Sequence, residues 1–217
     1  MHISEPVTML TDYLLAVLSL YWAFLLNRQG KRTQQLCIRF WAMALGMLAL
    51  AAALGGTSHG FKFYFNETQN TLIWKMTVYA TGLASFFMLL GAIRAGTFGI
   101  LRFGFSLAAV FKFAAYAVWM IKHDDFLYVM MDYVPAMCIV IAFQIREVMQ
   151  RKNSSAWWII AGILLSFLAA GVQASGLTLH EYFNHNDFFH VLQMVATYWL
   201  FRGVSLLQDA SDDFPFL

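Results

Sequence analysis

Histidine and aspartate residues gather near the end of the chain in a pattern that suits a metal site. The segment His185-Asn-Asp187-Phe-Phe-His190 places three such side chains within six residues of an otherwise apolar sequence. Imidazole and carboxylate are usual ligands of Zn²⁺, and a catalytic zinc keeps three protein ligands and an open water position. Residues three apart share a helix face, so Asp187 and His190 can face one ion, whereas His185 reaches it only from the preceding loop. Together with His59, these residues predict a zinc site.

A serine lies directly before the histidine of the earlier segment Gly55-Gly-Thr-Ser-His-Gly60. Adjacent residues on a helix diverge by about 100°. We therefore expect Ser58 to position water or stabilise an oxyanion instead of bonding His59 directly. The glycines of this segment equally fit a close helix-packing face that ends in a turn.

Two aspartates within apolar segments are candidates for proton transfer. Asp12 is interpreted either as a partner that orients a ligand histidine or as a general base. Asp132 is the other candidate base, and it lies close to Pro135, which predicts a helix kink and leaves a packing role open. The alternative for the whole set is structural pairing or snorkelling, which long side chains such as Lys75 and Lys112 do readily.

The elements that must position these residues are membrane helices. The chain has 217 residues, of which 60% are hydrophobic and only 12% charged, whereas soluble domains carry roughly 25% charged residues. This composition argues against a cytosolic enzyme, a nucleic-acid binder and a disordered chain. A spanning helix needs about 20 mostly apolar residues, and the sequence predicts an all-α, polytopic bundle of seven helices in one transmembrane domain, residues 1–217. The expected helices are 7–26, 36–60, 71–93, 98–121, 126–145, 156–175 and 187–207.

The basic residues predict how the bundle lies in the membrane. Alternate connections are rich in Lys and Arg, and such loops face the cytoplasm. They hold Arg28, Lys31, Arg32, Arg94, Arg146, Arg151 and Lys152, and Arg102 lies just beyond one of them. The opposite connections hold only Lys62 and Lys122. The N-terminus is therefore expected outside or in the lumen, and the C-terminal tail in the cytoplasm. The predicted location is a bacterial inner membrane or a eukaryotic endomembrane or plasma membrane.

Several short motifs resemble the CREST superfamily of seven-helix membrane proteins, which includes the alkaline ceramidases and the progestin and adipoQ receptors. The closest segments are Asp187-Phe-Phe-His190-Val191 and Phe201-Arg-Gly203-Val-Ser-Leu-Leu-Gln208, which look like the last helix of the adipoQ-receptor group. Glu5-Pro-Val-Thr, Gly55-Gly, His59-Gly-Phe and His185-Asn-Asp187 also look like a smaller, poorly characterised group. The resemblance covers the helix count and about a quarter of the residues.

The resemblance implies a zinc held by one histidine of the second helix and two of the seventh, with hydrolysis of a lipid amide or ester. His59 and His190 match this pattern. The other seventh-helix position is Asn186, which leaves the third ligand open between His185 and Asp187. Gly55 stands where the family has its serine, so Ser58 is a substitute for it. The family's aspartate near the third helix is absent.

Two functions follow from this reading. The first is a zinc-dependent intramembrane hydrolase that takes a lipid amide or ester from the bilayer. In it, His59, His190 and either His185 or Asp187 hold the metal, Asp12 or Asp132 takes the water's proton, and Ser58 positions the water or the oxyanion. The alternative is a receptor or an ion- or proton-coupled carrier that uses the same polar layer. Neither function is expected to involve a nucleic acid.

Overall fold

The computed structural model describes residues 3–151, 154–178, 180 and 183–211. Within these ranges the chain forms seven long helices: α1 Pro6–Arg32, α2 Leu36–Phe61, α3 Glu67–Gly96, α4 Gly99–Lys122, α5 Phe126–Arg151, α6 Ser154–Ser175 and α7 His185–Val204. A short 3-10 helix, η1 Lys62–Tyr64, follows α2. The described residues contain no strand, only an isolated bridge between His180 and Phe183. The all-helical architecture with seven helices is thus confirmed.

Six of the helices are long and apolar enough to cross a membrane; α7 is the one outside that set. Large apolar side chains cover the outside of the bundle, for example Phe24, Phe103, Phe111, Val118 and Trp157. A soluble monomer rarely exposes apolar patches of this extent. The exposed surface therefore fits contact with lipid chains, as expected of a multi-pass membrane protein.

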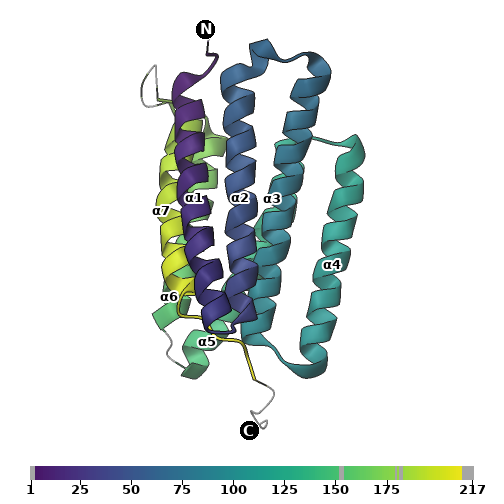
Figure 1. Ribbon diagram of the computed structural model, residues 1–217, viewed down its shortest axis with the longest axis vertical. Helices are drawn as coiled ribbons and strands as arrows, with labels where there is room; N and C mark the ends of the chain where they lie inside the picture. Colours follow the sequence, from purple (N-terminus) through teal and green to yellow (C-terminus); the bar gives the residue numbers. More distant parts are fainter. Residues whose placement is uncertain (1–2, 152–153, 179, 181–182, 212–217) are drawn as a thin grey trace.

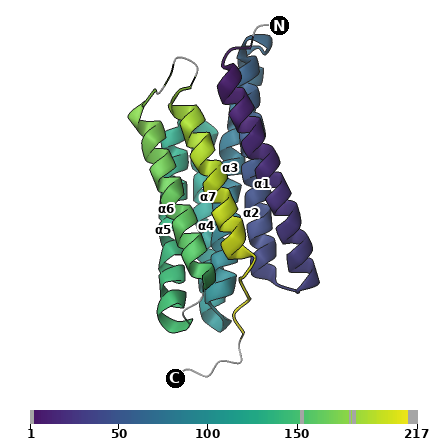
Figure 2. The same cartoon turned by 90° about the vertical axis from the view of Figure 1, so that its left-hand side faces the viewer.

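Six helices form a closed ring, and α4 lies outside it. Around the ring each helix contacts the next in the order α1, α2, α3, α5, α6, α7 and back to α1, while α4 packs on α3. Figure 1 shows α4 beside α3 at the edge of the bundle, away from α1 and α7. In the view turned by 90°, α5 and α6 lie on the side opposite α1 and α2 (Figure 2).

Helix ends differ from the expected ones where local capping extends a helix beyond its apolar part. The helix α3 begins at Glu67, before the expected residue 71, because Asn66 and Gln69 form a reciprocal capping box. The helix α1 runs on to Arg32 instead of ending at 26, with Lys31 and Arg32 in its last turn, where cations interact favourably with the helix dipole. Lys152 and residues 212–217 of the expected cytoplasmic tail lie outside the described residues.

The interior is divided along the bundle axis. The half nearest the C-terminal end of α1 is a packed apolar core that includes Leu26, Ile38, Trp41, Met88 and Val204. The half nearest the N-terminal end of α1 encloses a cavity, described below. Since the predicted zinc ligands and Asp12 all belong to this second half, the fold places the polar layer around a hollow instead of a solid core.

A segment after α7, residues 205–211 (the C-terminal strap), fastens the other end of the bundle. Asp209 accepts hydrogen bonds from the backbone N–H groups of Leu36 and Cys37 at the start of α2. It also forms an ion pair with Arg94 at the end of α3 (2.8 Å). Arg102 of α4 donates to the Ala210 carbonyl. Because Gln29 of α1 also donates to the Ser205 carbonyl, the strap connects α7 to four helices at the basic end.

Candidate functional site

Asp12 of α1 and His190 of α7 form a buried pair at one end of the cavity. The Nε2 atom of His190 lies 3.2 Å from Oδ1 of Asp12, and both side chains are more than nine-tenths buried. The Nδ1 atom of His190 lies 2.9 Å from the Thr11 hydroxyl oxygen. Two neighbouring residues of α1 thus hold both nitrogens of one imidazole, and Asp12 takes the position of a partner to a predicted ligand histidine.

The contacts of Thr11 assign the hydrogen atoms of the pair. Its single hydroxyl hydrogen is directed to carbonyl oxygens of its own helix, those of Val7 and Thr8. When that hydrogen is donated to one of these carbonyls, the hydroxyl oxygen accepts from His190 Nδ1–H. A single proton then lies between Nε2 and the carboxyl group of Asp12, on either atom. The other carboxyl oxygen of Asp12, Oδ2, is buried and has no hydrogen-bond partner among the described residues.

A second histidine is held in the same way from the same end of the bundle. The Nδ1 atom of His59 lies 3.1 Å from Oε2 of Glu5, just before α1, and Lys62 lies 3.7 Å from the other oxygen of that carboxylate. A carboxylate accepts only, so His59 donates from Nδ1. No hydrogen bond engages its Nε2 within the described part of the chain.

The helix contact between α1 and α2 brings Asp12 close to the glycine-rich turn. A Cβ atom on Gly56 would lie 2.9 Å from Cβ of Asp12, and one on Gly60 would collide with Met9. A Cβ atom on Gly55 would lie at an ordinary 3.5 Å from Oδ2 of Asp12. The glycines therefore form a close packing face, and Asp12 occupies the space beside the position where the resembling family has its serine.

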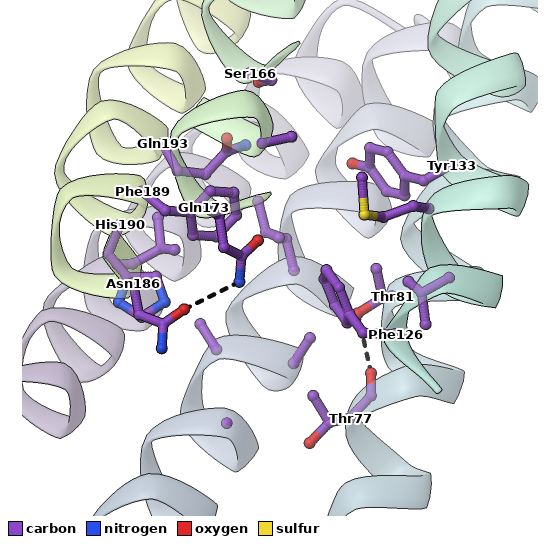
Figure 3. Close-up of a pocket in the computed structure, with 18 of the residues that line it drawn as sticks. Thr77, Thr81, Phe126, Tyr133, Ser166, Gln173, Asn186, Phe189, His190 and Gln193 are labelled. Carbon is purple, nitrogen blue, oxygen red and sulfur yellow. Dashed lines mark hydrogen bonds between the residues drawn. The ribbon is translucent and has the colours of Figure 1, made fainter. Parts of the chain in front are cut away.

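Asp12, His59 and His190 line one end of a cavity of about 320 Å³ that lies between six helices. Its polar lining at this end includes Asp12, His59, Gln173, Asn186 and His190, and Gln193 follows about one turn further along α7. Most of the remaining wall is apolar or aromatic, with Trp74, Phe126, Phe167 and Phe189 among its residues. Figure 3 shows residues of α7 on one side of the cavity and Phe126 and Tyr133 of α5 on the other. An apolar chamber with a polar end suits an amphiphilic molecule.

The two candidates for a third metal ligand do not line this cavity. The Oδ2 atom of Asp187 accepts from the backbone N–H of Asn184 at 2.7 Å, which forms the capping box of α7. His185 is the first residue of α7, and its Nδ1 is buried without a hydrogen bond in the described residues. Asn186, between them, does line the cavity and accepts a hydrogen bond from Gln173 (Figure 3).

Ser58 and Asp132, the other predicted catalytic residues, also lie away from the cavity lining. Asp132 of α5 is 2.6 Å from the ammonium group of Lys112 on α4, and Lys112 also donates to Ser85 of α3. This pair ties the outer helix α4 to the ring. Lys75, near the N-terminal end of α3, donates to carbonyl groups at the end of α4. The cavity lining therefore includes Asp12, His59 and His190, but neither Ser58 nor Asp132.

The fit to zinc is partial. Two tetrahedral ligands about 2.0 Å from a zinc ion lie about 3.3 Å apart, close to the 3.2 Å between Asp12 and His190. His59 could offer a third donor from the same end of the cavity. However, among the described residues no three His, Cys, Asp or Glu side chains lie close enough together to hold an ion. The predicted zinc site is therefore not assembled here, and zinc stays a prediction.

Two lining residues were missed at the level of sequence. Gln193 lies three residues after His190, on the same helix face, so the spacing alone could have placed it beside the histidine. Tyr133 follows Asp132 directly, and its orientation toward the cavity depends on how α5 is rotated within the ring. No sequence pattern carries that information.

Comparison with known proteins gives a family for the chain. A family model described as a family of unknown function, DUF6962, matches residues 7–209. The chain belongs to this family. The DUF6962 match spans all seven helices and ends at Asp209 of the C-terminal strap, so it includes both the cavity and the residues that fasten the opposite end. No curated protein and no solved structure matches the chain.

Proposed function

We propose that this protein is a membrane-embedded hydrolase that draws an amphiphilic molecule into the cavity and cleaves an amide or ester bond at its polar end. The observation that carries the proposal is the buried Asp12–His190 pair at the polar end of an otherwise apolar chamber. The resemblance of the motifs around His59 and His190 to the CREST superfamily supports the same reaction class.

The pair supplies the proton transfers that hydrolysis needs. With the shared proton on His190, the ionised Asp12 carboxylate takes a proton from water as the water oxygen bonds to the carbonyl carbon. The carbon–nitrogen or carbon–oxygen bond then breaks, and the same proton moves to the departing amine or alkoxide. The products are a carboxylic acid and an amine or alcohol, and the pair returns to its first state.

The proposal is tested with purified protein in nanodiscs. The measurement is the rate at which fatty acid is released from an acyl amide and from the matched acyl ester. Asp12→Asn and His190→Gln should each lower the rate about 100-fold or more, the usual contribution of general acid–base groups. Asp124, which is exposed, and His123, which is half-buried, do not line the cavity and give matched controls, Asp124→Asn and His123→Gln, which should keep the rate. No release by the unaltered protein, or full rates in both cavity variants, would contradict the proposal.

Zinc is the proposed cofactor, with Asp12, His59 and His190 as the residues that would hold it, in place of His185 or Asp187. Bound zinc would polarise the carbonyl and lower the pKa of its water. Elemental analysis of purified protein should find one zinc per chain, and His59→Ala and His190→Ala should lose it. Protein without stoichiometric zinc would remove the metal from the proposal and leave the reaction to the Asp12–His190 pair.

The second candidate is a proton-coupled carrier, and the Lys112–Asp132 pair within the apolar part of the helices favours it. Ionisable groups at such depth are costly and often belong to proton pathways. Proteoliposome flux that requires Asp132 but not Asp12 would favour the carrier. In both cases we propose that the basic end of the bundle, with the C-terminal strap, faces the cytoplasm and that the cavity lies toward the outer or lumenal leaflet.

A further inference from the structure

A second polar position lies deeper in the cavity than the Asp12–His190 pair. Gln193 of α7 lines the cavity and is only 7% exposed. Its amide makes no hydrogen bond to any described residue. The amide atoms are not fully enclosed by protein, so they are open to the cavity. Figure 3 shows the amide directed into the cavity. A buried amide costs free energy unless a partner satisfies it, so this side chain indicates a partner inside the cavity.

Tyr133 offers a phenol group from the opposite wall. It lies on α5, lines the cavity, and its hydroxyl forms no hydrogen bond within the described part of the chain. In Figure 3 the hydroxyl of Tyr133 and the amide of Gln193 face the cavity from opposite sides. Together they offer donors and acceptors to one group placed between them.

Nearby hydroxyl groups add acceptors but no free charge. Thr81 and Ser166 donate to carbonyls of their own helices and so present oxygen lone pairs to the cavity. No lysine or arginine is among the described residues that line the cavity. An anionic group at this depth would find no counter-charge, and burial of an unpaired charge is costly. Asp12 is the one carboxylate among the described lining residues, and it is paired with His190, so a cation at this depth would be unpaired too. The partner of Gln193 is therefore uncharged.

We infer that the molecule bound in the cavity carries a second, uncharged hydrogen-bonding group, a hydroxyl or an amide, which Gln193 and Tyr133 recognise. Gln193 is three residues beyond His190, about 4.5 Å deeper along α7 at 1.5 Å per residue. The second group therefore lies about four carbons into the chain from the reacting end. The inference rests on the proposed function at one point: the reacting end of the bound molecule lies at Asp12–His190.

Binding of unreactive alcohols tests this without hydrolysis. Purified protein in nanodiscs is loaded with tritiated hexadecanol, which is then displaced with unlabelled hexadecanol or with the analogue that carries a second hydroxyl about four carbons along. One added hydrogen bond should make the diol compete roughly five- to tenfold better. Gln193→Leu should bring the two competitors to equal potency.

Tyr133→Phe removes a single oxygen and should reduce the preference for the diol in part, with the cavity volume kept. Gln144→Leu is the matched control, because Gln144 is a buried glutamine of α5 that does not line the cavity; it should leave the preference unchanged. Retained binding of hexadecanol shows in each variant that the cavity has formed.

Equal competition by the two alcohols in the unaltered protein would overturn the inference, because water would then satisfy Gln193 as well as a ligand does. A preference that survives both Gln193→Leu and Tyr133→Phe would overturn it too. Failure of either alcohol to bind would instead overturn the proposed function together with the inference. A preference for the diol without any hydrolysis would uphold the inference alone.

Discussion

At the scale of single residues, the site depends on how closely α1 and α2 approach. Gly55 and Gly56 are neighbours in sequence but differ in what a methyl group would meet. On Gly56 it would meet Cβ of Asp12 at 2.9 Å and the Met9 carbonyl at 3.2 Å, whereas on Gly55 it would meet only Asp12 carboxyl atoms at ordinary distances. The position of Asp12 beside His190 is thus set by Gly56 in particular.

Gly56→Ala should therefore destabilise the protein, and Gly55→Ala should not. Overpacking costs about 1–3 kcal/mol, while alanine favours a helix over glycine by about 1 kcal/mol. We expect a lower Tm in detergent for Gly56→Ala and an equal or slightly higher Tm for Gly55→Ala. Equal Tm values for the two variants would mean that the helices adjust to the added methyl group.

The Lys112–Asp132 pair gives a second prediction at this scale. Lys112→Met removes the cation that pairs with the buried Asp132 carboxylate. The second oxygen of that carboxylate already has no hydrogen-bond partner among the described residues. Loss of one member of a buried pair costs about 3 kcal/mol or more, so the Tm should fall clearly. The double variant Lys112→Met with Asp132→Leu should recover most of the loss, and a double variant as unstable as the single one would contradict this account.

Sequence reasoning identified the ionisable residues of the cavity more readily than their partners. His59, His190 and Asp12 are conspicuous because ionisable residues are rare in apolar segments. The sequence could not decide between His185 and Asp187 as the third ligand of the predicted zinc site, because that choice depends on how helices distant in sequence pack. Asp187, which has a suitable spacing from His190, forms the capping box of its own helix, and the local sequence Asn184 to Asp187 could have indicated this role.

At the scale of elements, α2 relies on a residue far along the chain for its N-terminal cap. Gln35 precedes α2, but its side chain does not cap the helix; Asp209 accepts from Leu36 and Cys37 instead. Burial alone would raise the pKa of Asp209, yet the hydrogen bonds from the Cys37 backbone and from Arg94 outweigh it and hold the pKa below its ordinary value. The strap is therefore fastened by the ionised carboxylate.

Asp209→Ala should lower stability at neutral pH by about 1 kcal/mol, the typical contribution of a helix cap. The lowered pKa means that this stabilisation is complete above pH of about 4, the ordinary Asp value, and is lost as the pH falls through the folded-state pKa. Unfolding curves of the two proteins should therefore converge in acid. Ser211→Ala, an exposed change on the same strap, should match the unaltered protein throughout.

Helix ends were predicted well where apolar segments end abruptly and poorly where polar residues continue a helix. The start of α2 at residue 36 and of α5 at residue 126 agree with the expected positions. The additional turns of α1 and α5 at the basic end contain residues that were assigned to loops because of their charge. Charge alone does not end a helix, since Lys, Arg, Glu and Gln have high helix propensity.

At the scale of the whole molecule, the arrangement of basic residues predicts a single orientation. Thr33, after α1, and Thr68, at the start of α3, are both exposed and lie at opposite ends of the bundle. Since Cys37 and Cys138 are both free, they must first be replaced by alanine. A membrane-impermeant maleimide added outside intact cells should then label Thr68→Cys and spare Thr33→Cys. The reverse pattern would invert the proposed topology.

The helix count and the membrane class follow from composition, but the closed ring does not. Nothing in the apolar segments distinguishes α4, which packs outside, from the six helices that surround the cavity, because lipid and protein interior both favour apolar side chains. The one sequence sign is Lys112, whose charge requires a partner, and that partner on α5 became visible only when the helices were assembled.

Ring closure between α1 and α7 has a consequence for biosynthesis. Thr11 and His190 are 179 positions apart, so the first helix enters the bilayer long before its polar partner has been translated. Until then the carboxyl group of Asp12 lacks His190, the partner that it has in the folded protein. We therefore expect the cavity to be completed only after the seventh helix has been made and has joined the first.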